Sequence, residues 1–185
     1  CDLCQRTKRR TAHNSKLGKL PPKQAEVIPW ETLCVDLIGP YTIKRQGKKK
    51  PISLWAMTMI DPATGLLEVA EIKTKSADVV ANVAETTWFT RYPWPEKVIN
   101  DRGTEFMAEF KTMIKEDYNV KHKLITTRNP ASNAMIERVH QSICNMIRSF
   151  QVQDLEVTDE FSWTGILQAV SFAIRSTVHT TLRAT

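Results

Sequence analysis

From residue 30 onward, hydrophobic positions follow a strand-like period. Three apolar or alternating runs stand between short turn signals, at residues 30–38, 52–60 and 66–72. Gly39-Pro40 is expected to end the first run, and the DPATG segment at 61–65 is a strong turn signal between the second and third. The pattern therefore predicts three strands joined as an antiparallel meander.

Helical spacing appears after the third run. The expected elements are, in order, a helix from Ser76 to before Pro93, a short strand at 96–100, a helix whose apolar face holds Phe106, Phe110, Met113 and Ile114, a strand at 120–126, a long helix after Asn129-Pro130 and a last helix that carries Trp163 and Leu167. Strands reached through helical crossovers usually lie parallel to their neighbours. We therefore expect an α/β protein with an RNase H-like fold, in which helices flank a mixed five-stranded sheet.

Three acidic residues occupy informative places in this layout. Asp36 interrupts an apolar strand, and alternation puts it on the same face as Cys34 and opposite Val35. Asp101 follows the fourth strand, and Glu137 lies on the first turns of the long helix with 35 residues between the two. If the first and fourth strands are neighbours, Asp36 and Asp101 lie side by side, and the helix can bring Glu137 over them.

Carboxylates so close together repel one another unless a cation neutralises them. Magnesium and manganese prefer such oxygen ligands, and a pair of these ions can stabilise the attacking and leaving oxygens of a phosphodiester. Two of the three acids also have a plainer interpretation. Asp101 could cap a turn and Glu137 could be a surface residue, whereas Asp36, unpaired in an apolar strand, would be expensive. Together they favour a metal site.

Charge divides the chain unevenly. Residues 1–50 hold 12 Lys+Arg and 4 Asp+Glu, so the whole net charge of +6 arises there. This asymmetry indicates a polyanionic partner, and nucleic acid fits it better than a membrane surface. The candidate phosphate contacts are Lys8, Arg9 and Arg10 in an N-terminal arm and Lys48, Lys49 and Lys50 in a hairpin turn. The turn fits an ordinary solvated loop equally well. No apolar stretch is long enough to span a membrane, so no membrane partner is expected.

Four motifs together resemble a retroviral-type integrase, most of all those of gypsy-type LTR retrotransposons. They are Cys1-x-x-Cys4-Gln5-x-x-Lys8, then Trp30-Glu31 through Val35-Asp36 to Gly39-Pro40, then Asn100-Asp101-Arg102-Gly103-Thr104-Glu105-Phe106, and finally Asn129-Pro130 through Glu137-Arg138-Val139-His140-Gln141. The resemblance implies that Asp36, Asp101 and Glu137 are the catalytic D,D-35-E triad, with two Mg²⁺ or Mn²⁺ ions per site. It implies a polynucleotidyl transferase that trims the 3′ ends of element cDNA and joins them to target DNA, so that the expected partner is double-stranded DNA.

The resemblance also implies roles outside the triad. Cys1 and Cys4 match half of a His-His-Cys-Cys zinc site, which would be complete only with Zn²⁺ and residues upstream of this chain. We therefore divide the chain into the end of a zinc module with a basic linker at 1–29 and a catalytic core at 30–185. The residues matching DNA contacts of the family are Ser132, Asn133, His140 and Gln141. For these, helix capping or the polar side of an amphipathic helix is the alternative.

Alternatives stay open at this stage. Ala134 stands where the family commonly has Gly, which puts the flexibility of that loop in question. A domesticated or decayed integrase that only binds DNA or multimerises is therefore one rival, and a cut-and-paste DDE transposase is another. A ribonuclease H proper fits the 35-residue spacing poorly. As the resemblance implies, we expect a homo-oligomer, dimer or tetramer, that works in the nucleus after a cytoplasmic particle stage.

Overall fold

A computed structural model describes residues 28–43, 52–125, 134–152 and 162–177. Its centre is a five-stranded sheet in the order β3-β2-β1-β4-β5. The strands are β1 (Thr32–Ile43), β2 (Ile52–Ile60), β3 (Leu67–Ile72), β4 (Lys97–Asn100) and β5 (Lys121–Leu124). β1 to β3 form the predicted antiparallel meander, whereas β4 lies parallel to both β1 and β5. The predicted mixed sheet of an RNase H-like fold is confirmed.

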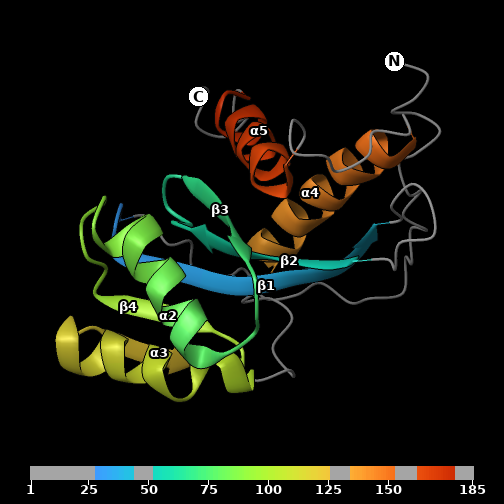
Figure 1. The fold of residues 1–185 in the computed structure, drawn as a ribbon. Helices are drawn as coiled ribbons and strands as arrows, with labels where there is room; N and C mark the ends of the chain where they lie inside the picture. The colour runs from blue at the N-terminus through green and yellow to red at the C-terminus, as the bar shows by residue number, and fades with distance from the viewer. Residues whose placement is uncertain (1–27, 44–51, 126–133, 153–161, 178–185) are drawn as a thin grey trace, which may run out of the picture.

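Helices cover both faces of this sheet (Figure 1). Two α-helices, α2 (Ala77–Ala84) and α3 (Glu109–Thr112), lie on one face. Each continues into a short π-helical turn, η1 (Glu85–Phe89) and η3 (Met113–Asp117), and a 3-10 turn, η2 (Thr104–Phe106), precedes α3. The other face carries α4 (Ala134–Val152) and α5 (Trp163–Arg175). No helix in the described part of the chain is long and apolar enough to cross a membrane.

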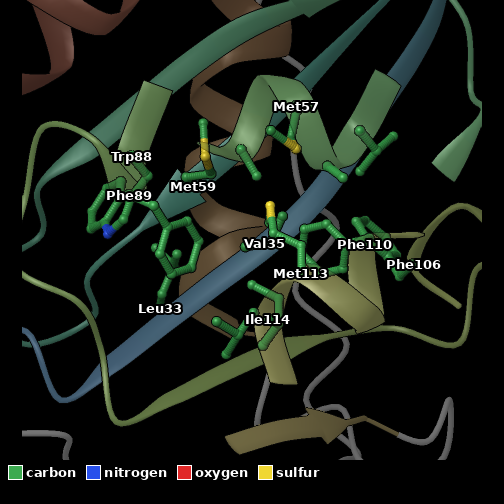
Figure 2. Close-up of a cluster of buried hydrophobic side chains, with 14 of the residues drawn as sticks. Leu33, Val35, Met57, Met59, Trp88, Phe89, Phe106, Phe110, Met113 and Ile114 are labelled. Carbon is green, nitrogen blue, oxygen red and sulfur yellow. The ribbon is translucent and has the colours of Figure 1, made fainter. Parts of the chain in front are cut away.

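Alternation along β1 divides the core in two. Leu33 and Val35 point into a cluster with side chains of α2, α3 and their extensions, shown in Figure 2. Cys34 points to the opposite face, into a second cluster with α4 and α5. The predicted helical core residues are buried there too; they are Phe106, Phe110, Met113 and Ile114 in the first cluster, and Ile143, Ile147, Trp163 and Leu167 in the second. Apolar side chains along the middle of β1 therefore alternate between two cores.

One expectation about β1 is wrong. Gly39-Pro40 does not end the strand, because pairing with β2 resumes at Tyr41 after an irregularity that begins at Ile38. Gly39 takes φ +124°, a backbone conformation that L side chains rarely adopt, and the chain can therefore kink without leaving the sheet. Turn-forming residues inside an antiparallel pair thus produce a bulge here.

A buried carboxylate ties α5 to the sheet edge. Glu68 of β3 is buried, and its Oε1 accepts hydrogen bonds from the Tyr92 hydroxyl and from Arg175 Nη1, the latter at 2.9 Å. Arg91 adds a longer ion pair of 3.6 Å to the same oxygen. Since a buried charge is tolerated only when it is paired and hydrogen-bonded, these contacts explain why an acid can lie beneath α5.

Candidate active site

Two of the predicted acids come together where β1 and β4 run parallel. The register pairs Cys34 with Ile99, and Asp36 and Asp101 each follow two residues later along the same direction. The Asp36 side chain is 24 % exposed, and Asp101 is on the surface at the end of β4. The neighbouring-strand arrangement on which the prediction depended is therefore confirmed.

The charge environment of Asp36 shows how crowded this point is. Burial raises the pKa of its carboxyl, the backbone N–H of Leu37 lowers it through a 2.8 Å hydrogen bond, and the charges of Asp101 and Glu105 raise it again. Lys75 partly offsets these acids, and the resulting pKa is about 6. Folding therefore holds Asp36 where ionisation is unfavourable, and a bound cation would relieve that cost.

A buried amide fixes the backbone that carries Asp101. Asn100 donates from Nδ2 to the carbonyl oxygen of Asp101 at 2.7 Å, and its Oδ1 is 2.6 Å from His122 Nε2 on β5. An amide oxygen can only accept, so His122 carries its ring proton on Nε2. Asp101 also accepts from the Gly103 N–H at 2.9 Å, which closes the turn after β4. Asp101 therefore has two roles: it closes the turn after β4, and it places a carboxylate near Asp36.

The long helix reaches the site through His140. Its Nε2 is 2.8 Å from Thr58 Oγ1 on β2, and Thr58 also donates to the carbonyl oxygen of Asp36 at 3.1 Å. Because Thr58 has one proton, donation to Asp36 leaves its oxygen as the acceptor of a His140 Nε2–H. Nδ1 of the ring is then unprotonated and faces Asp36 Oδ2 at 3.9 Å. Burial lowers the pKa of His140 to about 4, so at neutral pH this contact is not an ion pair.

We expect Thr58→Val to disturb this connection without changing the shape of the core. Valine leaves the buried His140 N–H without an acceptor, which should lower the free energy of unfolding by about 1–3 kcal/mol. Urea unfolding of the wild type, Thr58→Val and Thr58→Ser measures the effect. Thr58→Ser keeps the hydroxyl and is the matched control. If Thr58→Val is as stable as the wild type, the hydrogen bond to His140 does not contribute to stability.

The third predicted acid is less closely placed. Glu137 lies in the first turn of α4, one turn before His140, and it is exposed. Within the residues that the structure describes, no three His, Cys, Asp or Glu side chains lie close enough together to hold a metal ion. The role of Glu137 as a metal ligand therefore stays a prediction.

The other predicted site residues differ in what can be said of them. Gln141 is exposed and donates to Asn145 Oδ1 at 3.0 Å within α4. The His140 side chain is only 18 % exposed and is turned toward the sheet. DNA contacts by both residues stay predictions. The remaining candidates lie outside the described residues: Cys1, Cys4, Lys8, Arg9, Arg10, Lys48, Lys49, Lys50, Ser132 and Asn133.

Sequence reasoning missed two charged residues beside Asp36. Glu105 is nearly buried, and its Oε1 is 3.1 Å from the Lys75 ammonium in the segment between β3 and α2. Glu105 stands four residues after Asp101 in the motif Asp101-Arg102-Gly103-Thr104-Glu105, which was a usable signal. Lys75 gave none, because nothing local to its sequence relates it to either acid.

Known proteins provide an independent comparison. No family model matches the chain. In sequence it is similar to the retrovirus-related Pol polyprotein from transposon 412 of Drosophila melanogaster, with 26% identity over 148 residues, or 80% of this chain and 11% of that protein. It is also similar to the human gypsy retrotransposon integrase-like protein 1, with 25% identity over 149 residues, or 80% of this chain and 26% of that protein. The chain thus spans about a quarter or less of these relatives.

Solved structures agree on the fold. One chain of the cryo-EM structure of the simian T-cell lymphotropic virus intasome in complex with PP2A regulatory subunit B56 gamma matches with a TM-score of 0.70 and 13% identity, covering 92% of this chain and 58% of that chain. The magnesium-bound HTLV-2 integrase catalytic core domain matches with a TM-score of 0.62 and 13% identity, covering 88% and 96%.

Proposed function

Because the chain resembles Pol polyproteins and gypsy integrase-like proteins in sequence, and retroviral integrase catalytic cores in fold, we propose that it is the catalytic core of a retroelement integrase. Its reaction is the transfer of a DNA 3′ end to a phosphodiester of target DNA, preceded by trimming of that end with water. The observation that carries the proposal is the position of Asp36 and Asp101, each two residues beyond the paired Cys34 and Ile99 of neighbouring parallel strands, with Asp36 facing His140 of α4.

The donor set suits a hard divalent cation. Asp36 and Asp101 supply carboxylate oxygens, and burial together with the nearby charge of Asp101 already raises the pKa of Asp36. Magnesium or manganese bound there would stabilise the oxygens that gain charge during in-line displacement. Glu137 would complete the ligand set from α4.

The protein's own residues position these acids. Asn100 holds the backbone of Asp101, and Thr58 holds the backbone of Asp36 against His140. Residues that hydrogen-bond to a metal ligand fix its orientation, and mutating them commonly lowers metal affinity or activity by about 10- to 100-fold. We therefore include Thr58, Asn100 and His140 as supports of the site.

Further parts of the proposal rest on the resemblance and the relatives. The matched structures, an intasome and a trimeric catalytic core, support DNA binding and assembly into oligomers. The basic arm at 1–29 and the turn around Lys49 would hold the DNA backbone. Zinc binding at Cys1 and Cys4 would require ligands from outside this chain, and action in the nucleus follows if target DNA is chromosomal.

A strand-transfer assay tests the proposal. Short double-stranded DNA ends are incubated with target DNA and Mn²⁺ or Mg²⁺, using this chain and the same protein extended by any residues that precede Cys1 in its reading frame. We expect joined products from the extended wild type and a loss of more than about 100-fold for Asp101→Asn, because a ligand contributes at least as much as its supports. Equal products from both proteins, or none from the extended wild type, would contradict the proposal.

One observation favours a second function. The described residues hold no three metal-binding side chains in one group, and Glu137 is exposed. An integrase-derived protein that binds DNA or multimerises without catalysis fits that observation. It predicts salt-sensitive DNA binding that Asp101→Asn leaves intact, with no joined products from either protein.

A further inference from the structure

Lys75 places a positive charge at the edge of the acidic cluster. Its ammonium is 3.1 Å from Glu105 Oε1 and 4.5 Å from the centroid of the Trp55 ring. The side chain is 40 % exposed, whereas that of Glu105 is 10 % exposed. A carboxylate and an aromatic face therefore hold the ammonium in one place while it remains open to solvent.

Gly103 explains how Glu105 comes so near to Asp101. A Cβ added at Gly103 would lie 2.7 Å from Glu105 Oε2 and 3.0 Å from Asp101 Oδ1. Only a residue without a side chain leaves this space to the two carboxylates. Burial would raise the pKa of Glu105, yet its own backbone N–H and the Lys75 ammonium hold the pKa below its ordinary value. Glu105 is therefore charged at neutral pH.

The cluster thus has a definite charge balance. Asp36, Asp101 and Glu105 carry three negative charges, and Lys75 carries one positive charge. One carboxylate oxygen of Glu105 contacts the Lys75 ammonium, and the other shares the space beside Gly103 with Asp101 Oδ1. Two of these negative charges therefore stay uncompensated.

We propose that Lys75 is a built-in counter-cation of this site, which neutralises Glu105 and weakens the binding of a divalent metal ion at Asp36 and Asp101. The inference rests on the proposed function, because it concerns the same cation site. It assigns Lys75 and Glu105 as positioning residues that set metal affinity in opposite directions. The lysine keeps the acids folded together without metal, and its charge repels an incoming cation.

Isothermal titration of the chain with Mn²⁺ tests the proposal. Removing one positive charge from the surroundings of a divalent ion in a hydrated site should tighten binding roughly tenfold. Lys75→Met removes the charge and keeps the aliphatic stem over Trp55, and Lys75→Arg is the matched control that keeps the charge. We expect Lys75→Met to bind Mn²⁺ about tenfold more tightly and Lys75→Arg to bind as the wild type does.

Glu105 supplies the opposite test. Glu105→Gln should weaken Mn²⁺ binding several-fold, and the double variant Lys75→Met with Glu105→Gln should return to within about threefold of the wild type, because the two charges cancel. A merely structural ion pair would not give this cancellation. Binding by Lys75→Met that is unchanged or weaker, or a double variant as weak as Glu105→Gln, would overturn the proposal.

Asp101→Asn in the same titrations separates this inference from the proposed function. If Asp101→Asn binds Mn²⁺ as tightly as the wild type, the proposed metal site itself is wrong. If Asp101→Asn weakens binding while Lys75→Met does not strengthen it, the metal site stands and only the role of Lys75 is wrong. Circular dichroism of each variant verifies that the fold is retained.

Discussion

Asp36→Asn is expected to make the metal-free protein more stable at pH 8 and to abolish strand transfer. The folded state holds the pKa of Asp36 at about 6, well above the ordinary value of 3.8 for an aspartate. The folded protein therefore binds the proton more tightly than the unfolded chain does. As pH rises from about 4 to 6, the carboxyl is charged mainly in the unfolded chain, and the free energy of unfolding falls. Above about pH 6 the carboxyl is charged in both states, and the free energy of unfolding stays at the lower level.

Asparagine does not ionise and avoids this loss, while its Oδ1 can still accept from the Leu37 N–H. The free energy of unfolding of the wild type should therefore be about 3 kcal/mol lower than that of Asp36→Asn at pH 8, and about 0.5 kcal/mol lower at pH 4. Urea unfolding in EDTA at the two pH values measures this difference. A wild type that is the more stable protein at pH 8 would show that Asp36 is not held in an unfavourable place.

The same substitution should lower strand transfer by more than about 100-fold, since it removes a proposed ligand. Adding excess Mg²⁺ should raise the stability of the wild type and leave Asp36→Asn unchanged, because a cation that binds only the folded state stabilises it. A residue that weakens the fold but is required for activity is the expected signature of a binding site.

Among the glycines that the structure describes, Gly39 should be the one whose replacement by alanine lowers stability most. Gly39 has φ +124°, and an added Cβ would lie 2.8 Å from the backbone oxygen of Leu54 on the paired strand. A backbone atom in a sheet cannot move aside as a flexible side chain can. Strain of the dihedral angle alone costs about 1–3 kcal/mol, and the clash adds to it, so we expect a loss of at least about 3 kcal/mol.

Gly65→Ala is the matched control. Gly65 also has a positive φ, +76°, but its Cβ position meets nothing within 4 Å. Only the dihedral term remains, and the expected loss is about 1 kcal/mol. Urea unfolding of both variants checks the comparison. Equal losses at the two glycines would mean that the bulge in β1 adjusts to a side chain.

Much of the fold follows from local pattern. Alternation in the first strand places Leu33 and Val35 on one face and Cys34 and Asp36 on the other, and the structure has this arrangement. The bulge at Gly39 could not be predicted, because the same residues form either a turn or a bulge, and the choice depends on whether β2 continues to pair.

The site divides in the same way. Asp36 and Asp101 could be brought together from the order of strands alone. The contacts of Thr58 with His140 and of Lys75 with Glu105 join residues 82 and 30 positions apart. They depend on the height of α4 above the sheet and on the path of the β3–α2 segment, and sequence periodicity contains neither. The supports of a site are thus harder to predict than its acids.

The place of β1 between the two cores has a consequence for motion. A fluctuation that detaches β1 from the sheet near Asp36 must separate Val35 from one hydrophobic cluster and, at the same time, Cys34 from the other. Such an event approaches global unfolding and is rare, and backbone amides near Asp36 should be among the last to exchange with solvent. The part of the proposed metal site that β1 carries should therefore last as long as the fold itself.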